Sequence, residues 1–431
     1  MPNLLLTSTK VTRESLRVLH NNLVFTKGVN RQYDDQFAVV GAKIGNSINI
    51  RLPNQYTVRK GPALAAQNTV NTTTPLTLTT QWGVDVNFTT AELTLSLDDF
   101  GKLILTPAMA RLTSQIDQDG LAMFHFVYNQ VGFPGVIPGN AGGVVGTMTN
   151  SAAPAVYLDA GVFLSNFATP KDENRRIVLS PFANAASVSA LAGLLQAGDL
   201  IAEQYRRGVL GLALGFEFAE DQNINMLTTG THLGFATAVV RGAGQTGASL
   251  NTSGWTPTSA GILQPGEIFT IAGVNSVNPE NQTDTGLPAY FVVGGWSVGP
   301  SGVITSTPVN SDAAGWATIP ISPPIIPAGP GVANATVTNS PANNAVITLM
   351  SGAANTNFPQ LMAYHQDAFA LGTADLEMPG GVDFSGRETY DGISIRLIRQ
   401  YDINQDQLPC RIDVLGGWAA PRPSMAVRIT S

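Results

Sequence analysis

The spacing of apolar residues changes along this chain, and each change predicts a different kind of element. Between Lys43 and Leu95 apolar and polar residues alternate, as in Ile48-Asn49-Ile50-Arg51-Leu52, and this period of two predicts β-strands. The run from Asn68 to Pro75 between them is rich in Thr and Asn and has almost nothing apolar to bury. Because a two-stranded hairpin is marginal alone, we expect a long hairpin that gains stability by lying on a neighbouring subunit.

A helical period precedes this hairpin. From Lys10 to Leu23, the side chains of Leu16, Leu19 and Leu23 fall on one stripe, with charged residues elsewhere. A helix of this length is not stable alone in water. We therefore expect an N-terminal arm that docks on another surface.

The strongest helical pattern follows the hairpin. Leu97-Asp98-Asp99-Phe100 offers capping carboxylates, Thr106-Pro107 places proline at a first helical position, and apolar residues recur at near-helical spacing up to Val131. At 1.5 Å per residue, this pattern predicts a rod of about 37 Å. Gly120 in its middle disfavours a helix and predicts that another element packs closely there.

The rest of the chain divides into an α/β body and a β-rich insertion. Ile177-Val178-Leu179 predicts a strand, Ser180-Pro181 a helix start, and Val188 to Leu195 an apolar helix. From Thr228 to Ser351 short alternating runs are separated by Gly, Pro and Asn, which predicts a small all-β barrel or sandwich. Later strand patterns, up to Ala426 to Ile429, are expected to complete the body.

Composition indicates a protein that is incomplete alone. Of 431 residues only 12% are charged, against about 25% in ordinary domains, while 44% are hydrophobic, so we expect copies of the chain to cover one another. A net charge of -7 gives no basic field that would attract nucleic acid. The single cysteine, Cys410, excludes an internal disulfide and predicts a buried thiol. Uncharged stretches such as Val136 to Leu158 contain Gly, Pro and Asn, and Met1 to Ser8 lacks a secretion signal, so no membrane partner is expected.

Candidate chemistry is sparse. Gly242 to Gly247 matches G-x-G-x-x-G, but Gly and Pro residues after it prevent the helix that a dinucleotide site needs, which favours a turn. Asp402 to Asp406 resembles half a calcium loop without its glycine and its final glutamate, which favours a polar turn between strands. The four histidines are scattered. We predict no catalytic, cofactor-binding or metal-binding residue, and no enzyme.

Three runs, together with the order of the elements, carry a resemblance over nearly the whole chain. They are Phe269-Thr270-Ile271-Ala272-Gly273-Val274, Gln366-Asp367-Ala368-Phe369-Ala370-Leu371, and the closing run from Cys410 to Pro423. With the arm, the hairpin and the long helix, they resemble the major coat proteins of short-tailed phages of the P-22 type. The resemblance implies an α+β, HK-97-like capsid fold with peripheral and axial domains. Its expected parts are an N-terminal arm (1–42), an extended loop hairpin (43–96), a spine helix (97–132), a peripheral and axial body (133–227), an inserted β-barrel domain (228–351) and return strands (352–431).

The same resemblance implies a structural major capsid protein that self-assembles into an icosahedral shell around double-stranded phage DNA. The implied partners are copies of the chain in hexamers and pentamers, with a triangulation number of seven among the options. A scaffolding protein and a portal are also implied, with DNA only by non-specific proximity. The implied location is the virion capsid, assembled in the host bacterial cytoplasm, and no cofactor is implied.

Five cationic residues are the candidate contact residues. Arg51, Arg59 and Lys60 on the hairpin are expected to contact a neighbouring subunit, and Arg13 and Arg17 on the arm an acidic scaffold or adjacent coat. Solvated surface charge is the alternative for each of them. The alternative function is a virion- or cell-surface carbohydrate-binding protein. In that case Trp255, Trp296 and Trp316 of the insertion would stack on sugars, although turn and core packing explains these tryptophans equally well.

Overall fold

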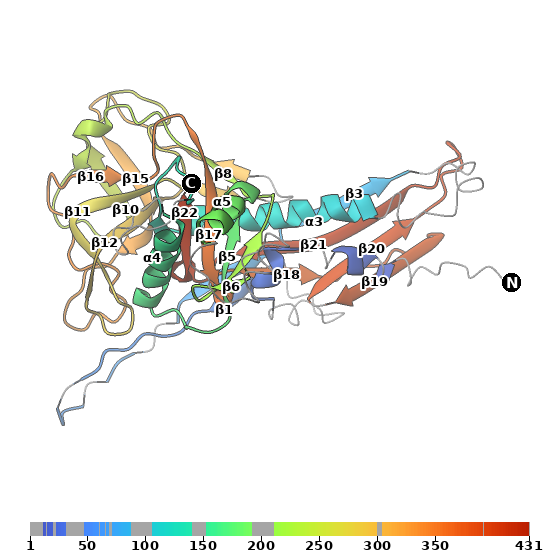
Figure 1. Ribbon diagram of the computed structural model, residues 1–431, viewed down its shortest axis with the longest axis horizontal. Coiled ribbons are helices and arrows are strands. Elements are labelled where there is room, and N and C mark those ends of the chain that lie inside the picture. The colour runs from blue at the N-terminus through green and yellow to red at the C-terminus, as the bar shows by residue number, and fades with distance from the viewer. Residues whose placement is uncertain are drawn as a thin grey trace.

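The structure, a computed structural model, is a mixed α+β fold with a long narrow part and a rounded β-rich part at its opposite end (Figure 1). It describes residues 12–13, 15–19, 23–31, 47–59, 61–64, 66–68, 71–87, 106–139, 152–191, 211–299, 304–390 and 392–430. The predicted capping segment Leu97 to Phe100 lies outside these residues. Within them, no helix is both long and apolar enough to span a bilayer.

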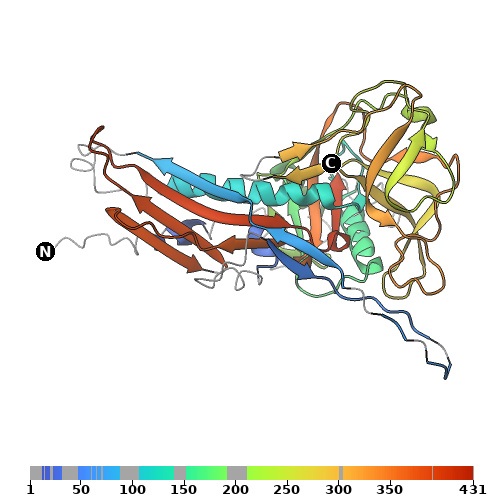
Figure 2. The same ribbon diagram turned by 180° about the vertical axis from the view of Figure 1, so that it is seen from behind.

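The narrow part consists of a five-stranded antiparallel sheet beside one long helix, as the view from behind also shows (Figure 2). The sheet order is β18 (Ala370–Ala374), β21 (Cys410–Ala419), β20 (Ile393–Arg399) and β19 (Phe384–Tyr390), and β3 (Thr80–Val86) also pairs with β21. Apolar residues of β21 and β20, such as Ile412, Val414 and Ile395, are buried. They share one core with the apolar face of the helix.

This helix, α3 (Thr106–Leu121), begins where the proline pattern predicts but is shorter than predicted. Its 16 residues span about 24 Å. A 3-10 helix, η5 (Ala122–Phe126), follows, and Val131 lies in strand β4 (Gln130–Val131). The predicted helix up to Val131 is therefore wrong, because aromatic and β-branched residues after Leu121 are weak helix formers and Val131 instead pairs with a strand.

Gly120 confirms the predicted close packing. A Cβ atom at this position would lie 2.6 Å from the Trp418 ring and 2.8 Å from the Phe25 ring. Only a residue without a side chain at position 120 allows Phe25 of the arm and Trp418 of β21 to pack on α3 at the same place.

A seven-stranded mixed sheet forms the middle of the molecule. Its order is β4, β22 (Ala426–Thr430), β17 (Asn357–His365), β5 (Arg175–Leu179), β7 (Phe216–Glu220) and β6 (Leu212–Ala213), and β8 (Met226–Thr228) also pairs with β17. Helices α4 (Ala153–Asn166) and α5 (Pro181–Leu191) lie beside it (Figure 1). The strand predicted at Ile177 and the helix start predicted at Pro181 are confirmed. The expected helix beyond Leu191 falls outside the described residues.

The β-rich part is built on a six-stranded sheet. Its order is β16 (Ile347–Leu349), β11 (Ile268–Val277), β12 (Asp284–Val293), β15 (Ala317–Ile325), β10 (Gly247–Ser253) and β9 (Val239–Val240), and β13 (Trp296–Val298) pairs separately with β14 (Ile304–Ser306). A bridge between Val239 and Val346 brings the two outer edges together. Leu250, Phe269 and Phe291 are fully buried in its core. The sheet with this one bridge shows part of the expected barrel.

Candidate assembly surfaces

The hairpin is anchored at its base and extends away from the body. Strands β1 (Ser47–Arg51) and β2 (Thr73–Thr77) pair antiparallel, with Ile48 opposite Leu76. The alternation of the sequence appears directly as alternating burial along β1, and Ile50 and Leu76 pack with Ala370 and Ala419. Beyond this base, the ribbon projects away from the body and ends below the β-rich part in this view (Figure 1).

Hydrogen bonds keep the projecting ribbon paired beyond the strands. The Leu52 backbone N–H donates to Thr72 O at 2.9 Å, and the Thr57 N–H donates to the Gln67 side chain at 2.8 Å. The described residues from 61 to 72 are all exposed to solvent. The described part of the ribbon is therefore paired by hydrogen bonds without a core of its own.

Three large apolar side chains on the ribbon are exposed. Val58 is 90% exposed, Leu64 88% and Tyr56 56%. The sequence interpretation missed them because it emphasised the polar run after Asn68. Apolar residues on both sides of a polar tip are the signal that would have found them. Side chains this exposed on a paired ribbon are suited to contact with another molecule.

Of the three cationic residues predicted on the hairpin, the structure describes two. Arg51 ends β1 and is exposed, and the Arg59 guanidinium donates a hydrogen bond to Gly61 O. Lys60 lies outside the described residues.

The arm docks on its own subunit. Residues 12–13 and 15–19 are helical, and Leu16, Leu19 and Leu23 are buried in the core of the narrow part, as their stripe predicts. Arg13 forms an ion pair of 3.3 Å with Glu388 on β19, and Arg17 is exposed. The Arg13 contact is thus within the chain, whereas scaffold and adjacent coat were the expected partners.

A buried acid fastens the end of the arm to α3. Asp117 accepts hydrogen bonds from Val24 N at 2.7 Å, Thr26 N at 3.0 Å and Thr26 Oγ1 at 2.5 Å. Burial raises the pKa of Asp117 to about 6, and the three hydrogen bonds oppose part of this rise. Sequence analysis missed this residue, because one acid in a helical pattern carries no sign of its partners.

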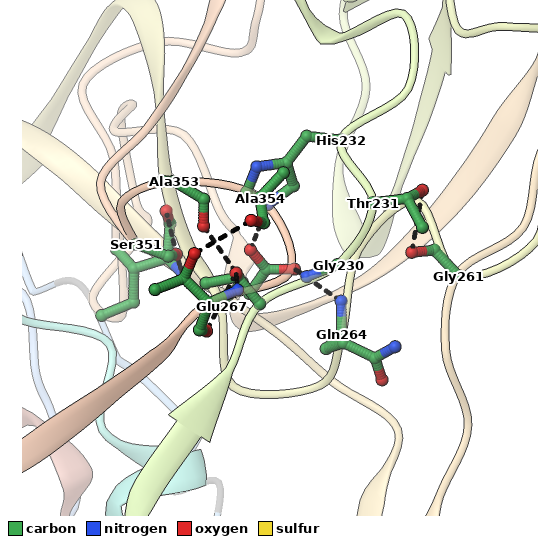
Figure 3. A network of polar contacts seen from close by, with 12 residues as sticks. Gly230, Thr231, His232, Gly261, Gln264, Glu267, Ser351, Ala353 and Ala354 are labelled. Carbon is green, nitrogen blue, oxygen red and sulfur yellow. Dashed lines mark hydrogen bonds and ion pairs between the residues drawn. The ribbon is translucent and has the colours of Figure 1, made fainter.

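A second buried acid lies where the chain enters the β-rich part. Oε2 of Glu267 accepts from Gly230 N at 3.0 Å and Gln264 N at 2.6 Å, and Oε1 lies 2.5 Å from His232 Nε2 (Figure 3). Arg428 of β22 is fully buried near this group. Burial lowers the pKa of Arg428 to about 9, and the charge of Glu267 opposes this shift. One carboxyl group therefore organises the chain entering the β-rich part.

The weak sequence motifs form turns, as predicted. Gly242, Gly244 and Gly247 have positive φ angles in a loop that leads directly into β10. Asp402 and Gln407 form a bridge that closes a turn between β20 and β21. Cys410 is buried, and burial raises the pKa of its thiol to about 11. Among the described residues, no group of three or more His, Cys, Asp or Glu side chains is arranged to hold a metal ion.

The three tryptophans of the carbohydrate alternative do not form an open stacking platform. Trp255 and Trp296 are buried, and the Trp316 ring lies 4.1 Å from the guanidinium of Arg241. Core packing, the other explanation, accounts for the first two.

The ribbon is anchored at its base and carries exposed apolar side chains, an arrangement suited to contacts with other chains. A family model described as P22 coat protein, gene protein 5, matches residues 3–430, so the chain belongs to this family. The chain is a structural major capsid protein of the virion, as the other members of this family are. Its arm, hairpin, long helix and two-part body form the expected HK-97-like fold.

Solved phage structures are also similar to the chain. A structure from Mycobacterium phage Che8 has 12% identity and a TM-score of 0.43, covering 94% of this chain and 90% of that one. The capsid of Cyanophage P-SCSP1u has 9% identity and a TM-score of 0.41, covering 89% and 83%. The mature capsid of bacteriophage PhiM1 has 9% identity and a TM-score of 0.41, covering 90% and 82%. These scores are below 0.5, so the family assignment rests on the family model. No curated protein matches the chain.

Proposed function

We propose that copies of this chain assemble into a closed icosahedral shell around double-stranded phage DNA, and that the hairpin tip makes an essential contact between copies. The observation that carries this proposal is the exposure of Val58 and Leu64 on a ribbon that its own subunit leaves uncovered. Burial of each side chain against a neighbour would contribute about 1.5 to 3 kcal/mol. Repeated around a shell, such a contact would favour assembly.

The finer parts of the proposal follow from family membership. They are hexamers and pentamers of the chain, a triangulation number of seven, a scaffolding protein, a portal, and assembly in the host bacterial cytoplasm. DNA contact is proposed only as non-specific proximity, which the net charge of -7 supports. Arg17, Arg51, Arg59 and Lys60 remain proposed contact residues, and Arg13 is proposed to exchange Glu388 for an acidic partner.

The division of the chain at 42, 96, 132, 227 and 351 is likewise proposed. Pairing of β8 with β17 supports an insertion that begins and ends beside these two strands. The helical part of the 97–132 segment is limited to α3 and η5 among the described residues.

Aspartates at the hairpin tip provide a direct test. In the double variant Val58→Asp and Leu64→Asp, we expect a folded subunit that forms no closed shells, because each aspartate would have to be desolvated at the contact. Electron microscopy of the purified variant measures shell formation, and circular dichroism measures folding.

Ile403→Asp is the matched control, since Ile403 is 80% exposed in the turn between β20 and β21. It should leave shell formation intact. Closed shells of normal size from the double hairpin variant would refute the role of the tip.

A further inference from the structure

A cavity of about 240 Å³ lies where four segments of the chain meet. Its walls come from the base of the hairpin, the end of α3 with η5, strand β13 of the β-rich part, and β21. Three of the five tryptophans of the chain, Trp82, Trp296 and Trp418, line it together with Phe126. Aromatic rings attract a cation placed over their faces, and several rings around one site are typical of organic ammonium recognition.

The cavity has one acidic group and no basic one among its lining residues. Oδ2 of Asp119 accepts a hydrogen bond from Trp82 Nε1 at 2.6 Å, and Oδ1 accepts one from Gln115 at 2.8 Å. No Lys, Arg or His in the described part of the chain forms an ion pair with Asp119. Each carboxylate oxygen can accept a further hydrogen bond. Asp119 is therefore held in position and still able to receive a cation.

The His125 ring, which stacks on Trp296, does not supply a positive charge to the cavity. The His125 ring lies 4.7 Å from the Trp296 ring at an angle of 8°. Burial lowers the pKa of His125 to about 4, so its imidazole is neutral at neutral pH. The aromatic wall consequently carries no positive charge of its own.

We propose that this cavity binds a small alkylammonium compound, such as a diamine. One ammonium group would lie against Asp119, and the other would lie over the tryptophan rings. Because the walls come from separate segments, the bound amine would connect the base of the hairpin to α3 and to the β-rich part. The ligand would thereby fix the direction in which the hairpin leaves the body.

The test uses the full-length, unassembled chain titrated with 1,4-diaminobutane. Binding is followed by tryptophan fluorescence and by calorimetry. The neutral analogue 1,4-butanediol has the same length and is the ligand control. We expect a saturable response to the diamine and none to the diol, and the response should persist in Trp316→Phe, whose tryptophan does not line the cavity.

Two variants separate this site from general attraction to an acidic protein. Asp119→Asn should weaken diamine binding at least tenfold, whereas Glu280→Gln, which removes an exposed charge elsewhere, should not. Ser297→Lys places an ammonium group at the lining itself and should abolish the response. Circular dichroism and the thermal midpoint show whether each variant is folded.

Several results would overturn the proposal: equal binding of diol and diamine, unchanged affinity in Asp119→Asn, or no saturable response in the wild type. The proposal would also be overturned if the tryptophan fluorescence changed with protein concentration but not with diamine. In that case a lysine from another copy of the chain, and not a small amine, would fill the cavity. Electron microscopy of Asp119→Asn measures shell formation. That measurement does not depend on diamine binding, so the proposed function can be tested separately.

Discussion

At the scale of single residues, burial sets the chemistry of Asp117. The charged form of this side chain is removed from water, and three hydrogen bonds from the arm compensate only in part. Its pKa therefore rises from 3.8 to about 6 in the folded subunit. A raised pKa means that the folded state binds the proton more tightly than the unfolded state does.

This shift predicts a dependence of stability on pH. Between about pH 6 and 3.8 the folded state is protonated at Asp117 and the unfolded state is not, so the contribution of this group to stability increases as pH falls. The full shift corresponds to about 3 kcal/mol. The unfolding free energy of the wild type, minus that of Asp117→Ala, should therefore become more positive from pH 7 to pH 4. Urea denaturation of the subunit measures both values. A constant difference across this range would contradict the assignment.

At the scale of elements, the helices and strands that could be predicted are those whose apolar residues repeat regularly over a short stretch of sequence. The alternation around Ile48 and Ile50, the stripe of the arm, and the start of α3 at Thr106-Pro107 all appear in the structure. The end of α3 could not be predicted from periodicity. Residues such as Phe124 and Val127 are buried on all sides, so apolar residues continue after the helix has ended.

The contact surfaces were less predictable than the elements. Arg13 pairs with Glu388, which is 375 positions away in the sequence, so no local pattern shows that its partner is within the chain. Val58 and Leu64 are apolar residues whose exposure depends on the absence of a third layer over the hairpin. Such properties belong to the tertiary arrangement, and spacing alone does not encode them.

Gly120 allows a test of how α3, the arm and β21 fit together. Replacing a helical glycine by alanine ordinarily stabilises a protein by about 1 kcal/mol. In Gly120→Ala the added methyl group would overlap the Trp418 and Phe25 rings, so we expect a net loss of about 1 to 3 kcal/mol instead. Gly161→Ala in α4 is the matched control, because its nearest neighbour atom lies at an ordinary 3.6 Å. Chemical denaturation of both variants measures the effect, and equal stabilisation of the two would contradict the packing argument.

At the scale of the whole molecule, the β-rich part depends on a small polar junction for its connection to the body. Thr229 and Thr356 exchange backbone and side-chain hydrogen bonds beside the strand pair β8 and β17. Glu267, directly before β11, accepts a hydrogen bond from the Gly230 N–H, two residues after the end of β8 (Figure 3). The direction of the β-rich part is thus set by buried polar contacts in addition to apolar packing, and buried polar contacts are costly to leave incomplete.

This junction gives the prediction with the largest structural consequence. Glu267→Ala would leave the buried Gly230 N–H and the half-buried Gln264 N–H without their acceptor, at about 1 to 3 kcal/mol for the buried one and less for the other. We expect lower stability and faster hydrogen exchange at these two amides, while Glu267→Gln, which retains an oxygen, should lose less. Glu280→Ala, at an exposed position in the same part, is the control. If Glu267→Ala matched this control in both unfolding free energy and exchange rates, apolar packing alone would hold the β-rich part in place, and the carboxyl group would not position it.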